Sequence, residues 1–308
     1  MTSGMVKRPH GGTDGGPITV AAPAKLNLAL HVVGRRADGF HVLESVVAFA
    51  LVHDTITVSP SPEFDLTVDG PFAKVLEEEA DRNLVIRAAR ALAAIASWPS
   101  GAAIRLTKRL PVASGIGGGS SDAAATLRAL AELWELAPST IENPEITAAL
   151  GADVPVCVSA RTAMMTGVGE RVTPLSPVPT VPVVLANPGV PVSTPAVFGA
   201  RRATFRPRGL VPPAAVTAGG LARWIGETAN DLTEPAMAVE PAVADVLEHL
   251  NALPGALVAR LSGSGATAFA LFETAAAATA AARHLAAARP GWWIRQSWIV
   301  GDARAVLA

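Results

Sequence analysis

A glycine-rich segment in the middle of the chain has the composition of an anion-binding loop. Residues 114–122 read SGIGGGSSD and run directly into an alanine-rich sequence that favours a helix. Glycines let backbone N–H groups approach an anion, the start of a helix adds partial positive charge, and Ser120 or Ser121 can cap the first amides. The segment therefore suits a polyphosphate, although an isolated loop of this kind is often only a tight turn before a capped helix.

Two familiar phosphate loops do not fit this segment. A Walker A loop would end in Gly-Lys-Ser/Thr, and a dinucleotide-binding loop would have a third spaced glycine where Ser120 stands. If the loop binds phosphate, it belongs to another class.

An acidic residue in an apolar segment is the second candidate. Asp153 lies in GADVPV, residues 151–156. Because an unpaired buried carboxylate is unfavourable, we expect a cation, a metal or a hydrogen-bonding substrate beside it. Lys25, on the polar face of a predicted strand, is the favoured cation. The alternatives are an aspartate that caps a helix before a strand and a lysine that is merely solvated.

An aromatic residue stands beside a histidine after the polar run 34–38. Phe40 can stack on a base and His41 can hydrogen-bond to it, although a phenylalanine packed into a nearby core is more common. The 6 histidines show no spacing that predicts a dedicated metal site. A catalytic metal would therefore arrive with phosphate oxygens.

Hydrophobic periodicity predicts the elements that position these residues. Alternation over residues 25–32 predicts a half-buried strand, from which Lys25 and Asn27 project the same way, roughly 6.5 to 7 Å apart. Residues 84–97 predict an amphipathic helix, and residues 104–107 predict a strand.

The sequence after the glycine loop predicts a second helix. Its buried stripe contains Leu127, Leu130 and Trp134, while Arg128 and Glu132 are expected one turn apart on its surface. Near the end of the chain, two strands (256–261 and 266–272), the glycine turn between them (262–265) and a helix (274–288) are predicted.

Length and composition favour a globular protein of one large or two modest domains. The chain has 308 residues, 50% of them hydrophobic and 17% charged, with a net charge of -1, which excludes disorder and any overall attraction to nucleic acid or anionic membranes. The proline-rich stretch 172–182 predicts a boundary between domains at 18–175 and 176–308, after a flexible tail at 1–17. A single cysteine and the lack of a signal peptide or long apolar stretch predict a cytoplasmic protein.

Three motifs in order resemble those of the GHMP small-molecule kinases: PAKLNL (23–28), GIGGGSS (115–121) and SGSGA (262–266). The similarity spans residues 18 to about 300. Segments 34–41, 151–156 and 187–198 are similar to the branch of this superfamily that acts on 4-diphosphocytidyl-2-C-methyl-D-erythritol in the non-mevalonate isoprenoid pathway. The resemblance implies an α/β (α+β) fold of two domains, with a left-handed βαβ crossover and the active site in the interdomain cleft.

The resemblance also implies roles for individual residues. Asp153 and Lys25 would be catalytic, and Ser121 or Ser120 would help to hold Mg²⁺. ATP would contact Asn83 near the adenine and, around the glycine loop, Pro111, Ser114, Gly115, Gly117, Gly118, Gly119, Ser120 and Ser121. The substrate would contact Asn27, Phe40, His41, Thr194, Phe198, Gly263 and Gly265. Phe40 stands where the family often has Tyr. Asp122 stands where Asn also occurs, and its carboxylate would repel phosphates unless it points away or joins the metal ligands.

The implied reaction is transfer of the ATP γ-phosphate to the substrate's 2-hydroxyl. Asp153 would accept the hydroxyl proton, while Lys25 keeps that carboxylate ionised. The expected partners are ATP, Mg²⁺ and the small cytidine diphosphate methylerythritol substrate, with no nucleic acid or membrane, in a monomer or weak homodimer. The alternatives are a sister kinase for homoserine or mevalonate-type alcohols, and a nucleotide- or RNA-binding module without catalysis.

Overall fold

Two long antiparallel strands form the spine of the molecule. In the computed structural model, which describes residues 16–76, 83–202 and 204–307, β1 (Ile18–Arg35) pairs with β2 (His41–Ser61) from end to end. The other strands are β3 (Asp65–Asp69), β4 (Gly101–Thr107), β5 (Ala163–Gly167), β6 (Arg171–Pro174), β7 (Val181–Asn187), β8 (Ala256–Leu261), β9 (Ala268–Phe272) and β10 (Trp293–Val300).

The strands form one 10-stranded sheet. Its main path is β3-β4-β2-β10-β7-β9-β8, and β5 also pairs with β2. β10 joins the two halves because Ile299 and Val300 pair with β2 while the same strand pairs with β7. β3 and β4 run parallel with a helix between them in the chain, which makes a βαβ unit. Its handedness stays a prediction.

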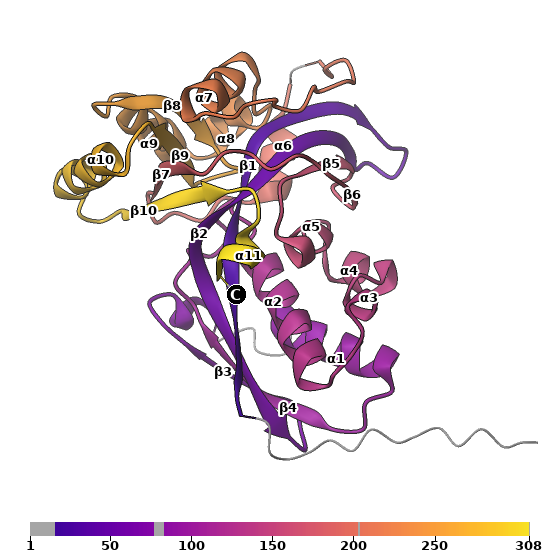
Figure 1. Ribbon diagram of the computed structural model, residues 1–308. Helices are drawn as coiled ribbons and strands as arrows, with labels where there is room; N and C mark the ends of the chain where they lie inside the picture. Colours follow the sequence, from indigo (N-terminus) through magenta and orange to yellow (C-terminus); the bar gives the residue numbers. More distant parts are fainter. Residues whose placement is uncertain (1–15, 77–82, 203, 308) are drawn as a thin grey trace, which may run out of the picture.

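Helices cover the sheet in two groups (Figure 1). Those of the first group, beside β1 to β4, are α1 (Leu84–Ala96), α2 (Gly118–Leu133), α3 (Pro138–Ile141), α4 (Pro144–Leu150) and α5 (Val154–Ser159). The second group, which follows β7 in the chain, contains α6 (Thr194–Ala200), α7 (Ala218–Glu227), α8 (Thr233–Val239), α9 (Ala242–Asn251) and α10 (Ala275–Ala288). The last helix, α11 (Ala303–Leu307), packs back against β1 and β2. No helix in the described ranges is long and apolar enough to cross a membrane.

The helix α2 lies at the centre of the first group. It packs against β1, α1 and α5, and three consecutive alanines in its first half, residues 123–125, are fully buried. Small side chains let these neighbours approach the helix closely. α2 therefore has little surface left for solvent.

Most of the predicted elements are present, with three differences. The polar side of β1 is buried, because Lys25 and Asn27 face the interior of the protein rather than solvent. Arg128 is also buried, so its predicted surface position is wrong. The sequence after Asp153 forms the short helix α5, whereas the capping alternative placed a strand there.

The predicted domain boundary lies between β6 and β7, in a connection without regular structure. The sheet continues across it through β10, and the division into domains stays a prediction. Residues 1–15 of the predicted tail lie outside the described residues.

Candidate active site

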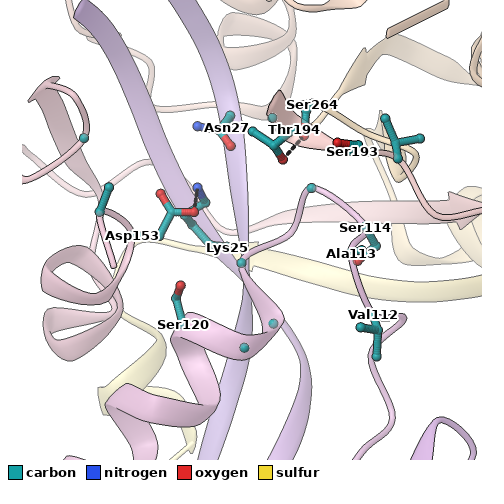
Figure 2. Close-up of a pocket in the computed structure, with 18 of the residues that line it drawn as sticks. Lys25, Asn27, Val112, Ala113, Ser114, Ser120, Asp153, Ser193, Thr194 and Ser264 are labelled. Carbon is teal, nitrogen blue, oxygen red and sulfur yellow. Dashed lines mark hydrogen bonds and ion pairs between the residues drawn. The ribbon is translucent and has the colours of Figure 1, made fainter. Parts of the chain in front are cut away.

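A cavity of about 670 Å³ lies where the three motif segments meet (Figure 2). Its lining comes from both sides of the predicted domain boundary. The lining residues that the sequence singled out are Lys25, Asn27, Asn83, Pro111, Ser114, Gly115, Gly117, Gly118, Gly119, Ser120, Asp122, Asp153, Thr194, Phe198 and Gly263. The other predicted site residues, Phe40, His41, Ser121 and Gly265, lie outside this lining.

The free edge of β1 brings the motifs together. Of the described strands, only β2 forms a ladder with β1, so polar backbone groups on the other edge need different partners. The Lys25 N–H donates to the Ile116 carbonyl at 2.9 Å, and the Asn27 N–H donates to Ser262 Oγ at 3.2 Å. The Ser262 hydroxyl in turn donates to the Gly115 carbonyl at 2.9 Å. These bonds fix the glycine loop against both other motifs.

Lys25 and Asp153 form the predicted ion pair. Lys25 Nζ lies 2.8 Å from Asp153 Oδ2, across 128 residues of sequence. The Lys25 side chain is only 5% exposed, whereas that of Asp153 is 35% exposed and faces the cavity (Figure 2). Although Asp153 stands at the N-cap of α5, its side chain makes no capping bond, so the capping alternative is wrong. The carboxylate is free to accept a proton from a bound molecule.

The glycine loop ends in a helix start that no side chain caps. The N-cap of α2 is Gly117, with φ +62°, so the helix begins before Ser120 and Ser121, and the predicted cap by either serine is wrong. Figure 2 shows the Ser120 side chain directed into the cavity. The Ser121 hydroxyl instead donates to the Pro23 carbonyl at 2.6 Å. The first N–H groups of α2 therefore remain open to an anion.

A buried group of three charges lies beneath this helix start. Lys108 Nζ contacts Asp54 Oδ2 at 2.6 Å and Asp122 Oδ2 at 2.5 Å, and a side chain at Gly118 would place its Cβ 3.1 Å from that ammonium. Asp54 Oδ1 also accepts the N–H groups of Arg109 and Leu110. Asp122 thus pairs with Lys108, and both residues line the cavity beneath the glycine loop.

The ionisation of this group follows from its burial. Burial raises the pKa of Asp122 to about 7, against the opposing effect of Lys108, and the nearby Asp54 raises it further. Burial alone would lower the pKa of Lys108, but the carboxylates of Asp122 and Asp54 outweigh it and raise that pKa. Asp122 therefore becomes largely protonated as the pH falls below about 7.

Aromatic side chains gather at the rim of the cavity. His41 stacks on Phe198 with ring centroids 4.9 Å apart, and Phe205 meets His41 edge-on at 6.3 Å. Phe40 is 63% exposed and lies outside this stack. Burial, followed by the cations of Arg35 and Arg201, lowers the pKa of His41. A neutral imidazole offers one donor and one acceptor, which suits the edge of a nucleobase.

Two asparagines form hydrogen bonds beside the third motif of the cavity. Asn27 donates to Ser45 Oγ at 2.8 Å, and its buried Oδ1 has no hydrogen-bond partner among the described residues, so it can accept a substrate hydroxyl. Asn230 donates to the Gly263 carbonyl at 2.7 Å and holds the third motif. Close by, the hydroxyls of Thr194 and Ser264 lie 2.8 Å apart.

Sequence reasoning missed Ser45, Asp54, Lys108, Phe205 and Asn230. A charged residue next to or inside an apolar strand was the available signal for Asp54 and Lys108, since each interrupts an apolar run. The other three carry no comparable signal in a single sequence.

The donor set fits a metal that arrives with a nucleotide. In the described parts of the chain, no group of three or more His, Cys, Asp or Glu side chains is placed to hold a metal ion. The cavity does contain the Ser120 hydroxyl and the Asp153 carboxylate, and Mg²⁺ is commonly held by one or two such oxygens together with phosphates. Of the two serines that the resemblance implies as metal ligands, Ser121 donates its hydroxyl to Pro23 and lies outside the cavity lining, which leaves Ser120 as the candidate.

Comparison with known sequences identifies two matching families. Residues 83–161 match the GHMP kinases N terminal domain, and residues 215–290 match the GHMP kinases C terminal domain. A 4-diphosphocytidyl-2-C-methyl-D-erythritol kinase of Parvibaculum lavamentivorans is 49% identical over 287 residues, covering 92% of this chain and 98% of its own. One of the same description from Ruegeria pomeroyi is 51% identical over 282 residues, covering 90% and 97%.

Solved structures show the same fold. A crystal structure of a 4-(cytidine 5'-diphospho)-2C-methyl-D-erythritol kinase aligns with a TM-score of 0.75 at 36% identity, over 92% of this chain and 100% of that one. A homoserine kinase from Cytophaga hutchinsonii aligns with a TM-score of 0.67, over 94% and 97% of the two chains. At 17% identity, the second likeness shows the fold alone.

Proposed function

The chain belongs to the GHMP kinases and, within them, to the family of 4-diphosphocytidyl-2-C-methyl-D-erythritol kinases, and from this membership we propose that it transfers the γ-phosphate of ATP to the 2-hydroxyl of 4-diphosphocytidyl-2-C-methyl-D-erythritol. The reaction would be a step of the non-mevalonate isoprenoid pathway. The observation that carries the proposal is the Lys25–Asp153 pair, 2.8 Å apart, in the same cavity as the uncapped start of α2.

Asp153 acts as the general base in this mechanism. Its carboxylate accepts the proton of the substrate hydroxyl as that oxygen attacks the phosphorus in line. Lys25 holds the carboxylate in place and keeps a positive charge beside the transferring group. The residues supply orientation and charge, which carry most of the catalysis of phosphoryl transfer.

The glycine loop supplies the phosphate site. The amides at the start of α2 would donate to phosphate oxygens. Asn83, which lines the cavity where α1 begins, would lie near the adenine. Mg²⁺, held by the Ser120 hydroxyl and the Asp153 carboxylate, would neutralise charge on the phosphates.

The rim residues select the cytidine end of the substrate. His41 would hydrogen-bond to the cytosine and Phe198 would stack on it, since both rings already lie together at the rim. The free Oδ1 of Asn27 and the hydroxyl of Thr194 would contact the methylerythritol diphosphate. The exposed Phe40, next to His41 in the chain, would stack on the base.

The cellular setting belongs to the same proposal. Near-zero net charge and a single cysteine support a cytoplasmic enzyme that acts on a small molecule without a nucleic acid or membrane partner. We infer a monomer or weak homodimer, with domains at 18–175 and 176–308.

The purified protein with ATP and Mg²⁺ tests the proposal. ADP release is measured with 4-diphosphocytidyl-2-C-methyl-D-erythritol, homoserine or mevalonate as the acceptor, and ³¹P NMR identifies the product. We expect turnover only with the first acceptor, and competition by cytidine nucleotides. Preference for homoserine or mevalonate would point to a sister kinase, and ATP binding without ADP release would point to a module without catalysis.

A further inference from the structure

Arg128 lies behind the active site, on a side of α2 that does not line the cavity. Its Nη1 donates to the carbonyls of Cys157 and Val158, at 2.8 and 3.3 Å, and its Nη2 donates to the carbonyl of Ala21 at 2.9 Å. The side chain therefore reaches from α2 to both α5 and β1.

The three acceptors are carbonyls that secondary structure leaves without partners. Cys157 and Val158 lie in the last turn of α5, where carbonyls lack an N–H donor further along the helix. Ala21 lies on the free edge of β1, where β2 offers no donor. One planar guanidinium thus supplies hydrogen-bond donors both to the last carbonyls of α5 and to a carbonyl on the edge of β1.

A second bond aligns α2 with the same edge. Ser121 and Arg128 are two helical turns apart on α2, and they donate to Pro23 and Ala21, which are two residues apart on β1. Residues at these spacings share one side of a helix and one edge of a strand. The helix that starts at the glycine loop is therefore fixed in register with the strand that carries Lys25.

Each element that Arg128 contacts carries part of the catalytic site. Ala21 lies four residues before Lys25, and Cys157 lies four residues after Asp153. The glycine loop opens α2 itself. The distance between Lys25 and Asp153 thus depends on how β1 and α5 sit relative to each other, and Arg128 is bonded to both.

Arg128 is a buried cation, which is unfavourable unless its hydrogen bonds are needed. Burial, together with the neighbouring Arg304, lowers the pKa of Arg128 to about 10, so the side chain is still cationic at neutral pH. Its bonded partners are all neutral carbonyls. Placing a cation in such surroundings is unfavourable compared with an apolar side chain of similar size, unless the geometry of its bonds is needed.

We propose that Arg128 is a positioning residue for phosphoryl transfer, which sets the Lys25–Asp153 geometry by tying α5 and β1 to α2. The inference rests on the proposed function. If Arg128 is removed, α5 and β1 keep only the weaker Ser121 link, from its hydroxyl to Pro23 and the Cys157 sulfur, and the Lys25–Asp153 pair itself, so the carboxylate can move relative to the ammonium. A misplacement near 1 Å can lower turnover on the order of 100-fold.

The experiment compares Arg128→Ala and Arg128→Lys with Leu127→Ala. Leu127 is the preceding residue of α2 and is fully buried, so its truncation leaves a cavity in the same helix without removing any bond to β1 or α5. Each variant is assayed for kcat, for KM of both substrates, for the pH profile of kcat and for Tm. Methylguanidinium is also added to Arg128→Ala at millimolar concentration, because Arg128 lines a cavity of about 510 Å³ through which the ion can enter.

We expect kcat to fall about 10- to 100-fold in Arg128→Ala, with a smaller fall in Arg128→Lys, partial rescue by methylguanidinium, and an acid limb displaced to higher pH. Leu127→Ala should lower Tm to a similar extent with a smaller loss of kcat and an unchanged pH profile. Losses of kcat that simply follow Tm in both variants, with identical pH profiles, would overturn the proposal.

A crystal structure of Arg128→Ala gives a readout independent of activity. The proposal predicts a Lys25–Asp153 separation longer than 2.8 Å, whereas an unchanged pair would contradict it. This measurement stands even if the wild-type protein phosphorylates a different alcohol, so failure of the proposed function and failure of the positioning role are told apart.

Discussion

Replacing Asp122 by asparagine is expected to change how the stability of the protein depends on pH. The Asp122 side chain is buried beside Asp54 and Lys108, and its Oδ1 has no hydrogen-bond partner among the described residues. Burial raises its pKa from 3.8 to about 7, and the neighbouring Asp54 raises it too, while Lys108 acts in the opposite direction. Asparagine closely matches the protonated acid in size and carries no charge.

The direction in which Asp122 changes the stability with pH follows from comparing its pKa in the folded and unfolded chains. The folded state holds the Asp122 proton more tightly, so the contribution of this group to stability is fully present below its unfolded pKa and is lost as the pH rises through its folded pKa. The limiting slope is about 1.4 kcal/mol per pH unit, so the loss between about pH 4 and pH 7 reaches at most about 4 kcal/mol. Asp122→Asn lacks this loss.

Equilibrium urea unfolding, followed by tryptophan fluorescence at a series of pH values, measures the effect. The free energy of unfolding of Asp122→Asn minus that of the wild type should rise between about pH 4 and pH 7 and then level off. Asp65→Asn, at an exposed aspartate in β3, is the control and should follow the wild type at every pH. A difference that stays constant with pH would refute the argument, because it would mean that Asp122 is ionised throughout this range.

Two further substitutions test the loop and the rim. Gly115→Ala should lower stability by about 1–3 kcal/mol and raise the KM for ATP, because φ is +78° there and an added Cβ would lie 2.3 Å from the Ser262 carbonyl. Gly226→Ala, in α7 with open space around it, is the control for thermal unfolding and should be neutral or slightly stabilising. In steady-state assays, Phe198→Ala should raise the KM for the cytidine substrate about tenfold and leave the KM for ATP unchanged, since it removes one stacking ring. Equal rises in both KM values would contradict a stacking role for Phe198.

The Lys25–Asp153 pair was predictable because a single physical constraint pointed to it. An acid in an apolar segment needs a partner, and a lysine on the polar side of a strand is a suitable one. The structure places the two groups 2.8 Å apart. The fold class rested instead on the resemblance of the three motifs, in their order along the chain, to those of the GHMP kinases.

The position of Arg128 was not predictable from its own helix. Its spacing from Glu132 is that of a solvent-exposed pair, and the local pattern carries no sign that β1, α1 and α5 together enclose α2. The sequence also could not show which of Ser120 and Ser121 faces the cavity, for a related reason. Neighbouring residues point about 100° apart on a helix, so the starting residue must be known before either hydroxyl can be assigned to the cavity.

The buried group of Asp54, Lys108 and Asp122 shows a second limit. Its members come from β2, from the end of β4 and from α2, and they meet only after the sheet and helix have packed together. The sequence indicated only that Asp122 should avoid the phosphates. The cation that it turns to follows from tertiary structure.

Single-turnover phosphoryl transfer by Asp153→Asn measures whether the carboxylate beside Lys25 accepts the proton of the substrate. With enzyme in excess over 4-diphosphocytidyl-2-C-methyl-D-erythritol, and ATP affinity measured separately by calorimetry, we expect a transfer rate about 10²- to 10⁴-fold below that of the wild type, with ATP affinity largely retained. Transfer at the wild-type rate would contradict it, because the carboxylate beside Lys25 would then have no part in accepting the proton.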